Sequence, residues 1–428
     1  MTGKVEREAA VSPAVTGTTA ETSETSSTTD NTPEDPAPTP KWRAWIRPWM
    51  APWIRSLKAA AGVWLAAGLA YVVVTVFAGR FVPTREPQVH NLLGSWYQFD
   101  TLFYVRIAED GYLYNKFAPA FYPLYPGLIK LFNPILPGGA FPAALFVSIM
   151  FALVALTMLH RLVDEEFGEK VASRTVFYIA AFPAGFFFLA AYNESLFLAL
   201  VLMSLYAARK GNFWFASAFA ALAGSTRLFG LLLAAPLAYE YMRQRGWSIR
   251  KIRWDALSFA FIPSGVIAFA IFLQIKLGDW LAFSHAQDGW KRTYGWPGQP
   301  IWKTLKLLND KPYLLDWRLL QGLNLVCVVG AMVLLLLTLR KGRFHFRRDQ
   351  YYLLVYAAAP IFLFICTEAG WPNYLMSAPR IALEWFPCFI VLGMMGASRT
   401  FERVYLFMAL TSQTLFLAPM LLQIQFFA

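Results

Sequence analysis

Long apolar blocks alternate along the chain with short polar segments. The blocks fall at about 59–78, 140–159, 172–191, 194–208, 255–275, 320–339, 351–367, 381–397 and 404–423. Most approach the roughly 20 residues that an α-helix needs to cross a bilayer. They lack the strict alternation of a membrane β-barrel, and only helices or closed barrels satisfy their backbone hydrogen bonds in lipid. The pattern therefore predicts an all-α fold, a polytopic membrane helical bundle.

One further apolar segment, 212–242, is flanked by basic residues at both ends. Both flanks are expected on the cytoplasmic side, so the chain must enter the membrane and return. Two full crossings need about 40 residues, and this segment is shorter. We expect a pair of short or tilted helices whose turn, near Ser225-Thr226-Arg227, carries Arg227 toward the outer half of the bilayer. With this pair, the chain is expected to make about eleven crossings.

Composition and charge agree with a membrane protein. Hydrophobic residues make up 57% of the chain and charged residues 15%, whereas soluble proteins have about a quarter charged residues. The net charge of +12 comes from Lys and Arg clustered between apolar blocks, as the positive-inside rule predicts, so nucleic-acid binding is not indicated. A basic run over 41–58 precedes the first block, which predicts that the N-terminus lies on the cytoplasmic side of the membrane.

The chain is expected to have two parts and two long outer loops. Residues 1–40 are rich in Ser, Thr and Pro and are expected to form a disordered cytoplasmic tail, whereas 41–428 form the membrane domain. The loops 79–138 and 276–319 are expected on the extracytoplasmic side. Within the first, the apolar section 117–132 contains three prolines, which argue against a spanning helix and for a re-entrant segment.

This topology gathers ionisable residues on one side of the membrane. Such residues in or beside spans are costly and are usually paired or functional. A one-sided cluster favours chemistry at the outer membrane–water boundary over an ion path through the bilayer. The residues that share this side are Asp100, Asp110, Glu194, Arg227, Asp279, Glu368 and Arg380.

Asp100 lies among aromatic residues just beyond the first span. A carboxylate that is partly shielded from water can act as a general base toward a hydroxyl group. The alternative is a helix N-cap, a position that Asp favours. Asp110 and Asp279 stand beside Gly111 and Gly278, which is typical of turns.

Short motifs, in a constant order over about residues 95–395, resemble those of a known family. They are Phe99-Asp100 through Gly111-Tyr112, Phe121-Tyr122-Pro123-Leu124-Tyr125-Pro126, Tyr192-Asn193-Glu194-Ser195-Leu196-Phe197, Thr226-Arg227-Leu228-Phe229-Gly230, the set Gly278-Asp279, Phe283, Gln287, Trp290 and Arg292, and Pro379-Arg380 with Pro387. Together they resemble the GPI mannosyltransferase 2 family and its bacterial relatives, within the GT-C superfamily. The chain departs from the family at Phe99 (Trp in the family), Asn193 (Ser or Thr) and Leu228-Phe229 (Ser-Asn).

The resemblance implies a GT-C-like membrane glycosyltransferase, located in the plasma membrane of a bacterial cell. Such an enzyme moves a hexose, mannose in the eukaryotic family, from a polyprenyl-phosphate donor to an acceptor hydroxyl on the extracytoplasmic face. Asp100 would take the acceptor proton, and the anomeric configuration would invert. The acceptor, a glycan, lipid or protein, is left open. A transporter or flippase of a lipid-linked intermediate, or a non-catalytic subunit of a membrane complex, is the alternative.

The resemblance also suggests substrate-binding residues, each with a structural alternative. Glu194 either lines the site or caps and pairs at a helix start. Arg227 contacts phosphate or sugar, or forms a buried ion pair. Arg380 contacts the donor phosphate or anchors the chain at the interface. Gln287, Trp290 and Arg292 shape a sugar site, although an aromatic belt also explains Trp290.

No cofactor is required by these residues. The histidines His90, His160, His285 and His345 are scattered without metal-binding spacing, so no zinc site built by protein side chains is predicted. A divalent cation that bridges Asp100 to the donor phosphate is compatible with the residues present.

Overall fold

A computed structural model describes residues 41–80, 93–309 and 315–422. The chain divides into two compact units, 1–47 and 48–428, and the account below concerns the second. The expected tail at 1–40 lies outside the described residues. The helices are α1 (Lys41–Ala78), α2 (Asp100–Asp110), α3 (Leu124–Phe132), α4 (Ala140–Phe167), α5 (Glu169–Ala181), α6 (Glu194–Arg209), α7 (Phe213–Gly224), α8 (Ala234–Gln244), α9 (Ser264–Leu277), α10 (Ala282–His285), α11 (Gln299–Asn309), α12 (Leu315–Leu339), α13 (Tyr351–Ile365), α14 (Ala378–Ala382), α15 (Phe386–Met395) and α16 (Arg399–Leu421).

The chain is a multi-pass integral membrane protein. Among the described residues, five helical stretches are long and apolar enough to cross a bilayer: Met50–Ala78, Ala140–Phe167, Trp254–Leu277, Arg318–Leu339 and Arg399–Leu421. The other apolar blocks form shorter helices, such as α6 with 16 residues and α15 with 10. The expected total of about eleven crossings, and the orientation in the membrane, stay predictions.

Helix α6 lies at the centre of the bundle and packs against α4 and α7. Most of its side chains are buried. The facing helix α4 buries several small residues, among them Ala143, Ala144, Ala152 and Ala155. Small side chains let helix backbones approach closely, which is how membrane helices gain packing energy where lipid supplies no hydrophobic drive. In contrast, α1, α9, α12 and α16 leave many large apolar side chains exposed, as expected of helices that face lipid.

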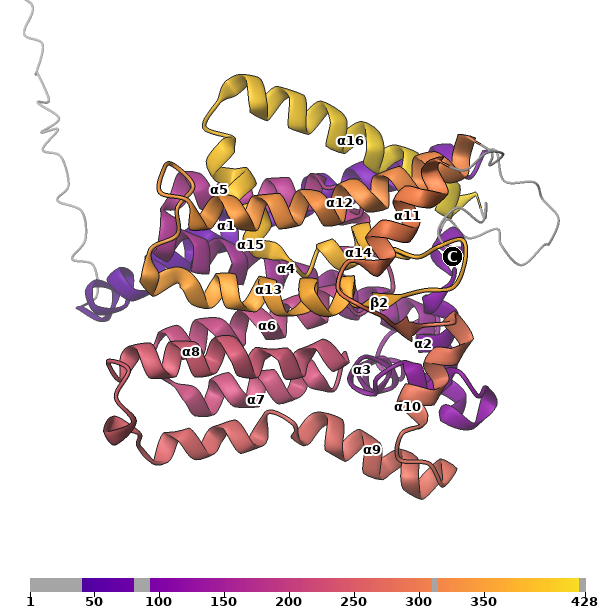
Figure 1. The fold of residues 1–428 in the computed structure, drawn as a ribbon, viewed down its shortest axis with the longest axis horizontal. Coiled ribbons are helices and arrows are strands. Elements are labelled where there is room, and N and C mark those ends of the chain that lie inside the picture. The colour runs from indigo at the N-terminus through magenta and orange to yellow at the C-terminus, as the bar shows by residue number, and fades with distance from the viewer. Residues whose placement is uncertain (1–40, 81–92, 310–314, 423–428) are drawn as a thin grey trace, which may run out of the picture. The chain divides into compact units, whose positions relative to one another are not determined.

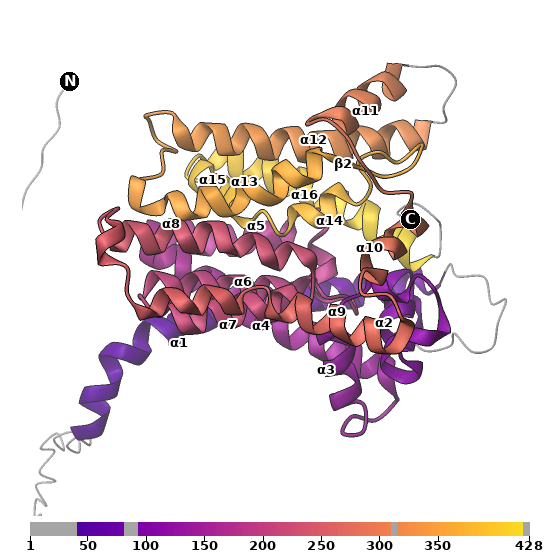
Figure 2. The same cartoon turned by 60° about the horizontal axis from the view of Figure 1, so that its bottom comes forward.

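Charged networks lie at both ends of α6. Glu194 begins the helix and belongs to the site described below, whereas Arg209 ends it. The Arg209 guanidinium binds Glu166, Glu240 and Asp349, with the Nη2–Oδ2 distance to Asp349 at 2.9 Å. Because a helix rises about 1.5 Å per residue, the two networks are roughly 22 Å apart. Figures 1 and 2 both show α2, α10, α14 and β2 gathered at the end opposite the α8–α9 connection.

Several sequence-based expectations agree with the helices, but the predicted blocks 172–191 and 381–397 are not continuous helices, since the second is divided between α14 and α15. The segment 212–242 forms the short helices α7 and α8, as predicted. The section 117–132 is not a spanning helix, since α3 has only nine residues. The predicted block 172–191 is wrong in its second half, because α5 ends at Ala181. Pro183 comes two residues later, and it pushes the preceding Phe182 out of the helical region, to ψ 148°. The freed segment then lines the cavity described below.

A two-stranded antiparallel ladder was not predicted. Strand β1 (Thr293–Tyr294) pairs with β2 (Thr367–Glu368), and Thr293 faces Glu368. The bond from the Gly295 amide to the Cys366 carbonyl, at 2.9 Å, extends the pairing. Strands this short carry no periodic signal, so only the tertiary contact identifies them. The ladder ties the loop between α9 and α11 to the end of α13.

Candidate active site

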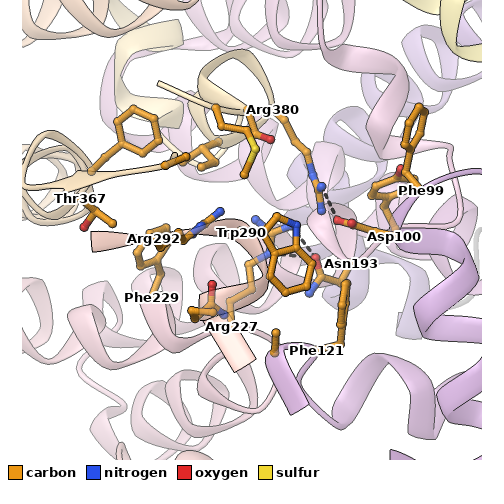
Figure 3. Close-up of a pocket in the computed structure, with 18 of the residues that line it drawn as sticks. Phe99, Asp100, Phe121, Asn193, Arg227, Phe229, Trp290, Arg292, Thr367 and Arg380 are labelled. Atoms are coloured by element: carbon orange, nitrogen blue, oxygen red, sulfur yellow. Dashed lines mark hydrogen bonds and ion pairs between the residues drawn. The ribbon is translucent and has the colours of Figure 1, made fainter. Parts of the chain in front are cut away.

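A cavity of about 730 Å³ is lined by residues of α2, α10 and α14, together with other elements. Its wall combines apolar and aromatic side chains with charged groups, and Figure 3 shows part of this lining. The cavity gathers all the residues predicted for the site except Glu194, which lies just behind its wall. Those in the wall are Asp100, Arg227, Gln287, Trp290, Arg292 and Arg380.

Asp100 is the first residue of α2, and its side chain is 22% exposed. The helix is capped by Phe99, and no side-chain bond caps it. The Asp100 carboxylate instead accepts a hydrogen bond from Nη1 of Arg380. The N-cap alternative is therefore wrong for Asp100. The preceding Phe99 has φ 51° and ψ −120°, which is a conformation that favours glycine.

Arg380, on α14, joins two carboxylates. Its Nη1 binds Asp100, and its Nε binds Glu194. The guanidinium also lies 4.6 Å from the ring centroid of Tyr192 and 5.4 Å from that of Phe187. Stacking on aromatic faces and forked hydrogen bonding both fix the plane of an arginine. Arg380 is thus held inside the fold, and the interfacial-anchor alternative is wrong.

Arg227 forms the buried ion pairs that were one of its two interpretations. It lies in the turn between α7 and α8, in extended conformation. Its guanidinium binds the carboxylates of Glu194 and Glu384. Its Nε also donates to the Asn193 side-chain oxygen at 2.8 Å, and the Asn193 amide donates to the Thr226 carbonyl at 2.9 Å. Arg227 also lines the cavity.

Glycine 230 allows the turn that carries Arg227. A Cβ atom at this position would lie 2.2 Å from the backbone nitrogen of Gly224. No side chain fits there without moving the backbone. The glycine of the Thr226–Gly230 motif is therefore explained by close approach of the turn to the end of α7.

Sequence reasoning missed two members of this network. Glu384, 2% exposed, precedes α15 in a block that was assigned to a span. Its signal was a single carboxylate inside an apolar block, four residues after Arg380. Asn193 was noted only as a departure from the family motif. Its pairing with Arg227 could not be foreseen, because a hydrogen bond between distant segments leaves no local pattern.

The loop around Trp290 forms an aromatic wall of the cavity. The Trp290 ring centroid lies 6.1 Å from that of Phe103, 6.1 Å from that of Phe117 and 5.8 Å from that of Phe121. Phe103 and Phe121 stack with centroids 4.5 Å apart. A planar aromatic surface beside charged groups suits the apolar face of a sugar ring or an isoprenoid chain.

The structure separates three residues of the predicted cluster from the site. Asp110 pairs with Arg106 at 3.2 Å. Asp279 accepts a 2.9 Å bond from the Leu281 amide, so it is the turn residue that was expected. Glu368 binds Lys303 at 2.6 Å. Within the described residues, no group of three His, Cys, Asp or Glu side chains is placed to hold a metal ion, and His90 lies outside them. The bridging cation stays a hypothesis.

Comparison with known proteins shows which part of the chain is similar to a known family. Residues 82–277 match the family described as Mannosyltransferase (PIG-V). A GPI mannosyltransferase 2 from Yarrowia lipolytica is 27% identical over 215 residues, which cover 48% of this chain and 57% of that protein. The chain therefore matches little more than half the length of this relative. The crystal structure of ArnT from Cupriavidus metallidurans bound to undecaprenyl phosphate has a TM-score of 0.47 and 14% identity, over 85% of this chain and 76% of that one.

Proposed function

Because residues 82–277 match the mannosyltransferase (PIG-V) family, we propose that the chain is a membrane glycosyltransferase of this family. It transfers mannose from a polyprenyl-phosphate donor to an acceptor hydroxyl on the extracytoplasmic face. The observation that carries this proposal is the carboxylate of Asp100 at the wall of a large cavity, held by Arg380 beside the Arg227 network.

Asp100 is the general base of the proposed reaction. Its carboxylate is accessible from the cavity and has one protein cation attached. A base must reach the proton that it abstracts, directly or through one water, and general-base catalysis contributes roughly 10²–10⁴-fold to rate. The acceptor oxygen attacks the anomeric carbon, the bond from that carbon to the phosphate oxygen breaks, and its electron pair stays on the phosphate. The acceptor proton passes to Asp100, and the configuration inverts.

The cavity suits a donor in which an apolar isoprenoid chain is joined to a polar phosphate and sugar. Part of its wall comes from Leu320 of α12 and from Phe416 and Met420 of α16. Both helices expose apolar side chains on their outer surfaces, as lipid-facing helices do. An isoprenoid chain can thus stay in apolar surroundings while its phosphate lies at the charged side of the cavity. Trp290 and the Phe103–Phe121 pair would bound the sugar, and the polar side chain of Gln287 lies beside them in the cavity wall.

The test is a transfer assay with purified protein in lipid. Radiolabelled polyprenyl-phosphate mannose is supplied with an extract of membrane glycolipids as acceptor. We compare the wild type with Asp100→Asn and with the control Asp110→Asn, which changes an exposed carboxylate on the same helix. Label is expected to reach a new product with the wild type and the control, and to fall by about 10²–10⁴-fold with Asp100→Asn.

Other results point elsewhere. Equal transfer by Asp100→Asn removes this residue from the mechanism. No transfer by the wild type with any of several donor sugars and acceptors contradicts the proposal and favours a lipid-intermediate transporter or a non-catalytic subunit. A parallel assay with and without EDTA tests the bridging cation.

A further inference from the structure

The arginines of the cavity differ in what they already bind. Arg227 makes ion pairs with Glu194 and Glu384, and Arg380 makes ion pairs with Asp100 and Glu194. Every one of these pairs is short and largely enclosed. Releasing either guanidinium for a ligand would leave a buried carboxylate without its partner, which is strongly unfavourable. Neither arginine is free to bind an incoming phosphate with its whole fork.

Arg292 is the exception. It lines the same cavity, and its side chain is exposed there. Among the described residues, no hydrogen bond or ion pair with its guanidinium is found. Figure 3 shows it on the other side of the cavity from Asp100, pointing inward. An accessible, uncommitted arginine inside a cavity is unusual, because an unpaired charge away from bulk water is costly.

The surroundings of Arg292 are unfavourable for an unpaired positive charge and favourable for the binding of an anion. The guanidinium of Arg292 is accessible from the cavity but surrounded by protein, and this partial desolvation lowers its pKa. The positive charges of Arg380 and Arg227 lower the pKa further, while Asp100 raises it. The guanidinium stays protonated, since an arginine is not deprotonated in proteins. An anion beside it would replace the missing hydration and offset the repulsion from the other two arginines.

The backbone on both sides of Arg292 is held in place before any ligand arrives. The next residue, Thr293, begins the ladder with Glu368. On the other side, a Cβ atom at Gly289 would lie 2.7 Å from the Phe117 ring, so this part of the loop is pressed against the aromatic wall. A donor fixed in advance at the place where charge develops stabilises a transition state without reorganising.

We propose that Arg292 is the principal phosphate ligand of the donor, whereas Arg227 and Arg380 are positioning residues that hold the carboxylates in place. The assignment rests on the proposed function and deepens it. It differs from the expectation that Arg380 contacts the donor phosphate. When the anomeric bond breaks, the electron pair and the added negative charge remain on the phosphate beside Arg292. The guanidinium forms up to two parallel N–H···O bonds with the phosphate oxygens, a geometry that a lysine does not reproduce.

The test measures binding separately from transfer. Purified protein in nanodiscs is titrated with undecaprenyl phosphate, and with undecaprenol, which lacks the phosphate. The variants are Arg292→Gln, Arg292→Lys and the control Lys291→Gln, which removes an adjacent exposed cation that is not in the cavity wall. Thermal unfolding of each variant confirms that it is folded.

We expect Arg292→Gln to weaken binding of the phosphate lipid at least tenfold and to leave undecaprenol binding unchanged, with Arg292→Lys intermediate. The control should bind as the wild type does. Equal binding of the phosphate lipid by Arg292→Gln overturns the inference, whether or not the wild type transfers mannose. If the variant loses binding and the wild type transfers no sugar, the phosphate subsite stands and the transferase proposal fails.

Discussion

The guanidinium of Arg380 binds the carboxylate of Asp100, a residue 280 positions earlier in the chain. The same guanidinium reaches Glu194 with its Nε, so one side chain orients the proposed base and the buried end of α6 together. This relationship explains how a solitary aspartate near a membrane boundary acquires a defined orientation. It also makes the geometry of Arg380, and not its charge alone, the quantity to test.

Replacing Arg380 by Lys should preserve folding but impair the reaction. An ammonium group is a compact point charge and does not span both Asp100 and Glu194 as the fork does. Loss of one charge-assisted hydrogen bond costs about 1.5–3 kcal/mol. We expect kcat to fall by roughly ten- to a hundredfold. The measurement is kcat in the transfer assay, with Arg399→Lys, at the exposed start of α16, as control. Full activity of Arg380→Lys shows that its charge alone suffices.

The Arg227–Glu384 pair should behave as a coupled unit. Removing one member of a buried ion pair typically destabilises a protein by about 3–5 kcal/mol, because the other charge is left unpaired. Arg227→Met and Glu384→Gln should each lower stability, and the double variant should lose less than the sum of the two. Detergent-induced unfolding of the four proteins measures the coupling free energy. Strict additivity contradicts direct pairing.

The Phe99→Gly variant should be more stable than the Phe99→Ala variant. Phe99 has a positive φ, which costs residues with a Cβ atom about 1–2 kcal/mol. Comparing Phe99→Gly with Phe99→Ala isolates this backbone term, since neither keeps the aromatic ring. We expect the glycine variant to be more stable by about 1 kcal/mol, the reverse of the usual helix order. The measurement is the difference in melting temperature between the two variants. A higher melting temperature for Phe99→Ala shows that the loop relaxes to a different backbone conformation.

Substitution of Gly230 should damage both fold and activity. The added Cβ atom would overlap the backbone of Gly224, which no rotamer change relieves. Gly230→Ala is expected to lower stability by about 1–3 kcal/mol and to shift Arg227 from its partners. The matched control is Gly127→Ala in α3, where no atom lies within 4 Å of the added Cβ. The control should be neutral or slightly stabilising. Similar melting temperatures for both variants refute the close-approach argument.

Substitution of Trp290 should affect donor binding more than the stability of the fold. Its ring is half-buried and contributes the aromatic wall with Phe103 and Phe121. We expect Trp290→Ala to raise the donor KM and Trp290→Phe to restore much of the affinity, since aromatic contacts contribute about 0.5–1.5 kcal/mol beyond area burial. Trp296→Ala, at an exposed position outside the cavity, is the control. An unchanged donor KM in Trp290→Ala places the sugar elsewhere.

Much of the fold could be predicted from the sequence because the length of an apolar run is a local property of the chain. The stretches that form α4, α12 and α16 can be recognised from about 20 successive, mainly apolar residues. The prolines at 119, 123 and 126 likewise argued against a spanning helix where α3 is short. In contrast, the end of α5 at Ala181 depended on a single proline within an apolar run and was missed.

The candidate site divides in the same way. The sequence by itself determined which residues were costly to place in a membrane, and so it singled out Asp100, Glu194, Arg227 and Arg380. Only the tertiary structure decided which of them pair, that Glu384 joins them, and that Arg292 has no hydrogen-bond or ion-pair partner among the described residues. The physical reason is that ion pairing depends on the distance and desolvation that helix packing creates between segments far apart in the chain, and no local pattern encodes either quantity.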